Sequence, residues 1–241
     1  MATQRRWFDR EGAEFGRGLG FFDAIYGFAI TLLIANVDVP PAESWRSIHA
    51  LLDHGLGSQL LGFAISFIVI AVFWRTNTRL VARFKGMDTA VIAANLVITF
   101  FIVILPFSTQ GISDTELSDL PLPTALYAAN VAAILLAQMI MFEIARARGL
   151  VADDVPKSAW WARRVDVLSQ VGLFIVSIPI AYFVSADWGK FTWLLLLLSG
   201  PVLGKWSDRV AKRAQLAEAA RLPAPSAGAG TSDAGTSTDT P

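Results

Sequence analysis

The chain has 241 residues, of which 54% are hydrophobic and only 17% are charged, and its mean hydropathy is +0.50. Soluble domains carry about a quarter of charged residues, so this composition argues against a soluble domain and favours a membrane protein. The 20 Lys and Arg residues balance the 20 Asp and Glu residues, and the absence of cysteine excludes disulfide bonds and thiolate chemistry.

Six apolar runs follow one another along the chain, each near the ~20 residues that a helix needs to cross a bilayer. They predict transmembrane helices at 19–37, 56–74, 89–107, 124–145, 165–185 and 188–204, the last two as a tight helical hairpin. The predicted fold class is therefore all-α, a polytopic membrane protein with six transmembrane helices.

The basic residues between these runs predict the orientation of the chain. All but two of the 20 Lys and Arg residues lie on one side, and the exceptions are Arg46 and Lys190. The positive-inside rule makes the richer side cytoplasmic, so both termini are expected there. We expect a cytoplasmic N-terminal segment (1–16), a transmembrane domain (17–206) and a cytoplasmic tail (207–241), disordered from about 222 because its composition cannot form a core.

The first apolar run contains charges that a simple membrane anchor would lack. Arg17 precedes it, and Asp23 lies one turn inside. Charge at membrane depth is costly, so such residues tend to face protein or a water-filled path. Their spacing puts them about 240° apart around one helix, so each needs a partner on another helix or subunit. The first helix is therefore predicted to line a passage.

The same run also carries an apolar stripe. On an α-helix Phe28, Leu32 and Ala35 share one face, and Thr31 lies beside it. One interpretation is ordinary packing against lipid or other helices. The functional interpretation is a hydrophobic constriction, which gates ions by dewetting.

Polar groups are expected on the outer side. Asn36 and Asp38 follow the stripe at the outer end of the helix, where they could receive a cation that sheds water. The outer loop 108–123 has no Lys or Arg and contains three acids, Asp114, Glu116 and Asp119. Such a surface attracts cations.

Polar residues in the later runs have structural interpretations. Asn95 and Gln138 lie within predicted spans and are expected to form interhelical hydrogen bonds. Glu143 and Asp166 lie near the cytoplasmic ends of two spans, where we expect pairing with Arg146, Arg163 or Arg164. Trp160 is interpreted as an interfacial belt residue.

The sequence gives little support for an enzyme, a metal site or a nucleic-acid-binding protein. The sequence has no Ser-His-Asp set, no His-Glu-x-x-His and no phosphate-binding glycine loop, so we expect neither an enzyme nor a cofactor. His49, Asp53 and His54 match no common metal-ligand spacing, and an interfacial helix with Trp45 at the headgroup level is favoured over a metal site. The basic residues are scattered, which argues against a nucleic-acid partner.

Several motifs in the first half of the chain resemble one family. They are Arg17-x-x-x-Phe21-Phe22-Asp23, Ala29-Ile30-Thr31-Leu32-Leu33, Pro40, Phe73-Trp74, Asn95 and Pro106-Phe107-Ser108-Thr109. Together they resemble the Arg-x-x-x-Phe-Ser-Asp signature and the following helices of the transmembrane protein 175 family of potassium channels. The resemblance covers about residues 15–110.

The resemblance implies a homotetramer in the cell membrane whose first helices line a central pore selective for potassium ions. By position, Phe28 would form the constriction, with Thr31, Leu32 and Ala35 on the succeeding layers. Arg17, Phe21, Asp23, Trp74 and Asn95 would belong to the motif network that braces the first helix. Asn36 and Asp38 remain at the outer mouth.

The chain departs from the family pattern at four positions. Phe22 replaces the motif serine, and Phe28 replaces Ile or Leu at the constriction. Gly27 stands where relatives often have Ala, and Asn77 where many relatives have histidine. Our hypothesis is a passive, potassium-selective channel. The alternative is a non-conducting membrane scaffold or a secondary transporter on the same fold.

Overall fold

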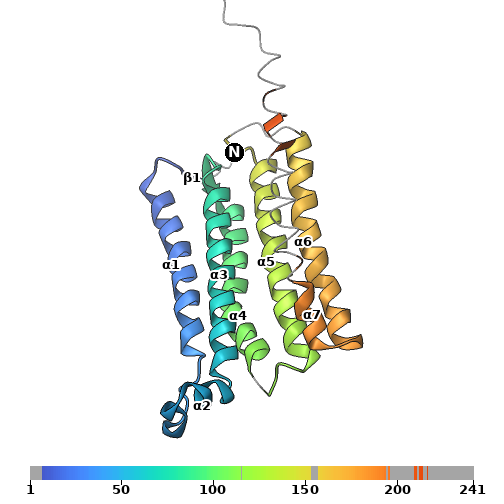
Figure 1. The fold of residues 1–241 in the computed structure, drawn as a ribbon. Coiled ribbons are helices and arrows are strands. Elements are labelled where there is room, and N and C mark those ends of the chain that lie inside the picture. Colours follow the sequence, from blue (N-terminus) through green and yellow to red (C-terminus); the bar gives the residue numbers. More distant parts are fainter. Residues whose placement is uncertain are drawn as a thin grey trace, which may run out of the picture.

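The computed structural model describes residues 7–114, 116–152 and 157–193, and the single positions 195, 209, 210, 212, 213 and 216. In chain order its elements are β1 (Trp7–Asp9), α1 (Ala13–Ala35), the 3-10 helix η1 (Ala42–Arg46), α2 (Ile48–Asp53), α3 (Leu56–Val81), β2 (Gly86–Asp88), α4 (Thr89–Ser113), α5 (Pro121–Ala147), α6 (Lys157–Phe183) and α7 (Ala186–Thr192). The long helices run side by side, with α2 at one end of the bundle and β1 at the other (Figure 1).

Five helices of the described chain are long and apolar enough to cross a membrane. They are α1, α3, α4, α5 and the Trp160–Phe183 part of α6. The all-α fold class and the first five predicted helices are thus confirmed. The sixth predicted span begins in α7, but most of it lies outside the described residues, as do residues 1–6 and most of the tail.

The helices pack in an order that makes α4 central. It contacts α1, α3 and α5, and α5 in turn packs against α6. Ile98, Ile102 and Leu105 recur at helical spacing on α4 and are fully buried. As a result, α1 and α6 lie on opposite sides of the bundle (Figure 1).

A close approach joins α3 to α4 near the outer end of the bundle. Thr109 donates a hydrogen bond to the Ser66 hydroxyl at 2.7 Å. Nearby, a β-carbon added to Gly62 would lie 2.6 Å from the β-carbon of Ser113, closer than van der Waals contact allows. Glycine at position 62 therefore permits this helix contact, as small residues commonly do in membrane bundles.

Gly62→Ala should lower the free energy of unfolding by about 1 to 3 kcal/mol, because the new methyl group forces α3 and α4 apart. Ser113→Gly should restore part of the loss, since it removes the atoms that the methyl group meets. Thermal unfolding of the purified variants measures both effects. Gly172→Ala is the matched control, because nothing lies within 4 Å of its added β-carbon. An equal loss in this control would contradict the steric explanation.

Three segments meet at the end of the bundle that carries β1. β1 pairs antiparallel with β2, and Phe84 forms a bridge with Val151. The Arg10 side chain donates hydrogen bonds to the carbonyl oxygens of Ala82 and Phe84, which follow α3. This arrangement brings the N-terminal strand together with the segments that follow α3 and α5, which contain Arg83, Lys85 and Arg148, at what we call the basic end. The strand pair adds to the predicted all-α fold.

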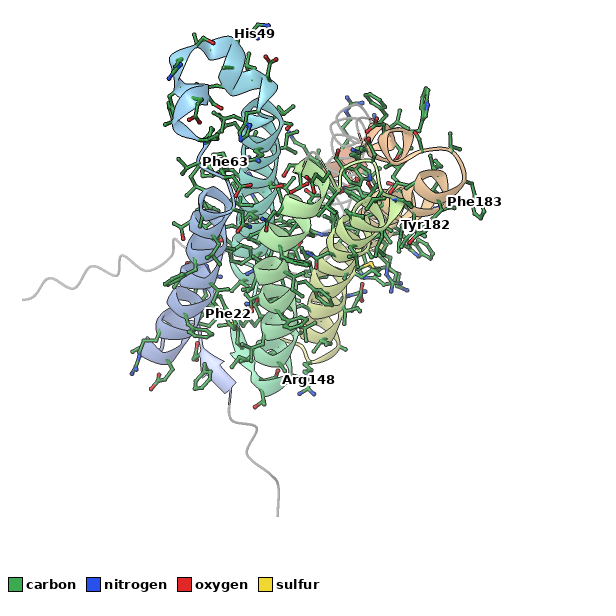
Figure 2. The ribbon with its side chains drawn as sticks, turned by 90° about the horizontal axis from the view of Figure 1, so that it is seen from below. Phe22, His49, Phe63, Arg148, Tyr182 and Phe183 are labelled. Atoms are coloured by element: carbon green, nitrogen blue, oxygen red, sulfur yellow. The ribbon has the colours of Figure 1, made fainter. Side chains whose placement is uncertain are left out.

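Asp88 links two helices at the basic end. One carboxylate oxygen accepts hydrogen bonds from the backbone N–H groups of Ala90 (3.1 Å) and Val91 (3.0 Å), which caps α4. The other oxygen lies 2.5 Å from Nη1 of Arg148, the residue that follows α5. Figure 2 shows Arg148 at the same end of the molecule as β1.

Asp88→Ala should destabilise the protein by about 2 to 4 kcal/mol, because it removes both a helix cap and a charge-assisted hydrogen bond. Asp88→Asn should cost less, since its amide oxygen can still cap α4. Chemical unfolding in detergent measures the difference. Asp53→Ala serves as the control, because the side chains of Asp53 and its partner His49 are 67% and 87% exposed. A loss as large as that of Asp88→Ala in this control would contradict the prediction.

Candidate functional site

The two faces of α1 differ in burial. The face toward α3 and α4 contains five buried residues, Phe15, Phe22, Tyr26, Ala29 and Leu33. The opposite face is exposed and contains Arg17, Phe21, Ala24, Phe28, Thr31 and Ala35 at intervals of three or four residues. No other helix of the described chain covers this second face, which we call the α1 stripe. It is free to contact lipid, a second subunit or water.

The predicted constriction residues lie on or beside the α1 stripe. Phe28 is 71% exposed and Leu32 is 44% exposed. The Thr31 hydroxyl donates a hydrogen bond to the Phe28 carbonyl oxygen at 2.8 Å, so its oxygen lone pairs stay available. The stripe thus presents a phenyl ring followed, toward the outer end, by a hydroxyl oxygen.

Two residues of the predicted motif network contact each other directly. The indole nitrogen of Trp74 on α3 donates a hydrogen bond to Oδ1 of Asp23 at 2.8 Å. This bond gives a half-buried carboxylate a donor at membrane depth, where an unpartnered charge is costly. It fastens α1 to α3 beside the stripe.

The other α1 members of that network lie on the stripe. Arg17 is exposed and forms no ion pair with any residue that the structure describes. Phe21 is 56% exposed, and its ring meets that of Phe22 edge to face at 5.7 Å. Phe22 is buried and lies between α1 and its neighbours in Figure 2. It places a phenyl ring where a serine would supply a hydroxyl.

Some buried polar side chains form hydrogen bonds between helices, and others do not. The amide of Gln138 on α5 donates a hydrogen bond to the Phe73 carbonyl oxygen at 3.2 Å, as expected for an interhelical bond. The expectation for Asn95 is wrong, because both of its amide atoms are buried without a hydrogen-bond partner in the described chain. Within the same part of the chain, Oδ1 of Asn77 also has no partner. A polar residue in a span predicts a bond only where a neighbouring helix offers a group at the same depth.

The outer end of α1 is held by hydrogen bonds to a side chain of α3 and a backbone carbonyl of α4. Asn36 donates a hydrogen bond to the Pro106 carbonyl oxygen at 3.0 Å. The backbone N–H of Asp38 donates to Oε1 of Gln59 at 2.9 Å. An open pocket beside them is lined by Asp38, Pro40, Asp53, His54, Leu56, Gln59, Asp114 and Glu116. Asp38 and two acids of the predicted outer loop are thus brought together, whereas the sequence did not predict that Gln59 and His54 would line the same pocket.

Known proteins similar to this chain include potassium channels. Residues 17–106 match the family described as endosomal/lysosomal potassium channel TMEM175. A potassium channel of Streptomyces collinus is 28% identical over 180 residues, which cover 69% of this chain and 85% of that protein. A potassium channel of Chryseobacterium sp. strain P1-3 is 26% identical over 109 residues, or 45% of this chain, and the match spans 54% of that relative's length.

The fold also has a solved counterpart. The crystal structure of a lysosomal potassium-selective channel TMEM175 homolog from Chamaesiphon minutus superposes with a TM-score of 0.59 at 22% sequence identity, covering 84% of this chain and 98% of that one. Over residues 17–106 the sequence is similar to the TMEM175 potassium-channel family, and over most of its length the chain shares the fold of a TMEM175 homolog.

Proposed function

We propose that the protein is a passive, potassium-selective cation channel of the cell membrane, formed by four copies of the chain around a central axis. The observation that carries this proposal is the α1 stripe, an exposed helix face opposite the one that packs against α3 and α4. The potassium channels related in sequence support it. A passive channel requires neither a cofactor nor a catalytic residue.

In this proposal, Phe28 forms the narrowest part of the pore. Four phenyl rings around the axis would exclude water and thereby resist the passage of hydrated ions. Thr31 and Ala35 would form the succeeding layers, with Leu32 at their side. The Thr31 hydroxyl oxygen, whose proton is engaged by the Phe28 carbonyl, would face a passing cation as an acceptor.

The ends of the proposed pore have different chemistry. Asn36 and Asp38 would form the outer mouth, next to a pocket that also carries Asp114 and Glu116 and so concentrates cations. At the inner end, Arg17 would find its partner on an adjoining subunit, since the described part of its own chain supplies none. Asp23 and Trp74 would hold α1 at a fixed distance from the axis.

Two measurements test the proposal. Potassium flux into liposomes that contain the purified full-length protein should exceed the flux into empty liposomes and should exceed sodium flux. The mass of the protein in detergent should correspond to four chains. A monomer would contradict the proposal, because a single chain cannot enclose an axis. Absence of flux from both the wild type and Phe28→Ala would favour a non-conducting scaffold, and flux coupled to a second ion gradient would favour a transporter.

A further inference from the structure

A cluster of cationic and aromatic side chains lies where α5 and α6 meet at the basic end. The guanidinium carbons of Arg146 and Arg164 lie 4.7 and 4.2 Å from the centroid of the Trp160 ring. Oε1 of Glu143 accepts a hydrogen bond from the Trp160 indole at 2.7 Å and lies 3.3 Å from Nε of Arg164. We call these four residues the arginine–tryptophan cluster.

The charges of this cluster do not balance. Its single carboxylate, Glu143, pairs with Arg164, and Arg146 has no carboxylate within ion-pair distance in the described chain. Contact with an aromatic face attracts a guanidinium without neutralising it and leaves its N–H donors free for other acceptors. Two further guanidinium groups, those of Arg83 and Arg163, lie 5.8 and 5.6 Å from the centroid of the Phe142 ring, and Phe142 directly precedes Glu143 on α5. The cluster therefore carries excess positive charge and unused donors.

The position of the cluster suits contact with the surface of a membrane. Arg146 lies in the last turn of α5, and Trp160 lies in the first turn of α6. Both residues are half-buried, so part of each remains accessible at the surface. Because α6 lies on the side of the bundle away from α1, this surface would face lipid in an assembly built around the α1 stripe (Figure 1).

A simpler explanation is that these arginines only set the topology of the chain. Such arginines need only be near the ends of the spans. Here, however, Arg146 and Arg164 share one indole ring, and Glu143 orients that ring through its N–H group. Ordered guanidinium groups around a ring of fixed orientation constitute a binding site in a way that scattered surface arginines do not.

We infer that the arginine–tryptophan cluster, with Arg83, binds the headgroup phosphate of an anionic phospholipid in the cytoplasmic leaflet. Guanidinium groups bind phosphate oxygens through pairs of charge-assisted hydrogen bonds. Basic pockets between transmembrane helices on the cytoplasmic side favour anionic headgroups for this reason. The inference requires the predicted orientation of the membrane but does not require ion conduction.

The test is native mass spectrometry of the full-length protein titrated with phosphatidylglycerol or with zwitterionic phosphatidylcholine. The wild type should retain phosphatidylglycerol preferentially. Arg146→Gln should weaken this binding roughly fivefold, and Arg146→Gln combined with Arg83→Gln should weaken it roughly 25-fold, because each guanidinium near the surface contributes about equally. Arg79→Gln is the matched control, since Arg79 is an exposed arginine at the C-terminal end of α3.

The outcomes separate a lipid site from general charge attraction. An unchanged affinity in Arg79→Gln, together with the loss in Arg146→Gln, supports the site. Equal losses in the two variants, or no preference for phosphatidylglycerol in the wild type, would overturn it. Displacement of the lipid by inorganic phosphate at equal concentration would also overturn it, because the ligand would then be a free anion. If Arg146→Gln fails to fold, the Arg83→Gln variant alone carries the same comparison.

Discussion

Phe28→Ala should increase the potassium leak of liposomes that contain the protein and should lower its preference for potassium over sodium. The phenyl ring is 71% exposed on the α1 stripe, so its removal leaves the packing against α3 and α4 intact. Four such removals would widen and wet the proposed constriction. A reduction of about 1.4 kcal/mol in the barrier to permeation is enough to increase the flux tenfold, and we expect at least this increase.

The control for this experiment is another exposed phenylalanine. Phe183 at the end of α6 is 87% exposed and projects from the side of the molecule away from α1 (Figure 2). Phe183→Ala should leave flux and selectivity at wild-type levels. An equal rise in both variants would indicate nonspecific leakage. No change in Phe28→Ala, with an active wild type, would remove Phe28 from the constriction.

The features that the sequence predicts well depend on regular patterns along a single helix. The apolar runs locate α1, α3, α4 and α5, because hydropathy summed over a span reports the free energy of transferring it from water into lipid. The period of the helix similarly predicts that Phe28, Leu32 and Ala35 share one face of α1 with Thr31 beside it, and all four residues are exposed. Neither prediction requires knowledge of which helices become neighbours.

Features that depend on contacts between distant segments are harder to predict. Because β1 is only three residues long, its pairing with β2 leaves almost no local pattern. The helix α6 begins at Lys157, before the apolar run at 165–185, because its first two turns are basic and aromatic rather than apolar. The sequence also predicts a pair for Glu143 among three arginines, and only the structure selects Arg164.

Asn95 shows why a motif alone does not define a site. Its place in an apolar run predicts an interhelical hydrogen bond, yet both amide atoms are buried without a partner in the described chain. The motif residues Asp23 and Trp74, 51 positions apart, do form a bond. Which of the motif residues meet is decided by the depth and rotation of α1, α3 and α4 relative to one another. The bonded pair is therefore the part of the network that experiment should address first.

Trp74→Phe should destabilise the protein by about 1.5 to 3 kcal/mol, because it leaves the Asp23 carboxylate half-buried without its donor. Phenylalanine keeps an aromatic ring at this position and removes the indole N–H. Asp23→Ala should cost a similar amount or less, since it removes the charge along with the bond. Thermal unfolding of the purified protein measures both losses.

The double variant decides whether the Asp23–Trp74 bond itself is responsible. If the two side chains act through their 2.8 Å contact, Trp74→Phe should cost much less in the Asp23→Ala background, with a coupling free energy of about 1 to 2 kcal/mol. Trp161→Phe provides the control, since Trp161 is 59% exposed and its indole donates to no residue that the structure describes. It should change stability by less than about 0.5 kcal/mol. Additive losses at positions 23 and 74 would mean that lost ring packing, rather than the hydrogen bond, joins α1 to α3, and the position of the α1 stripe would then depend on apolar contacts alone.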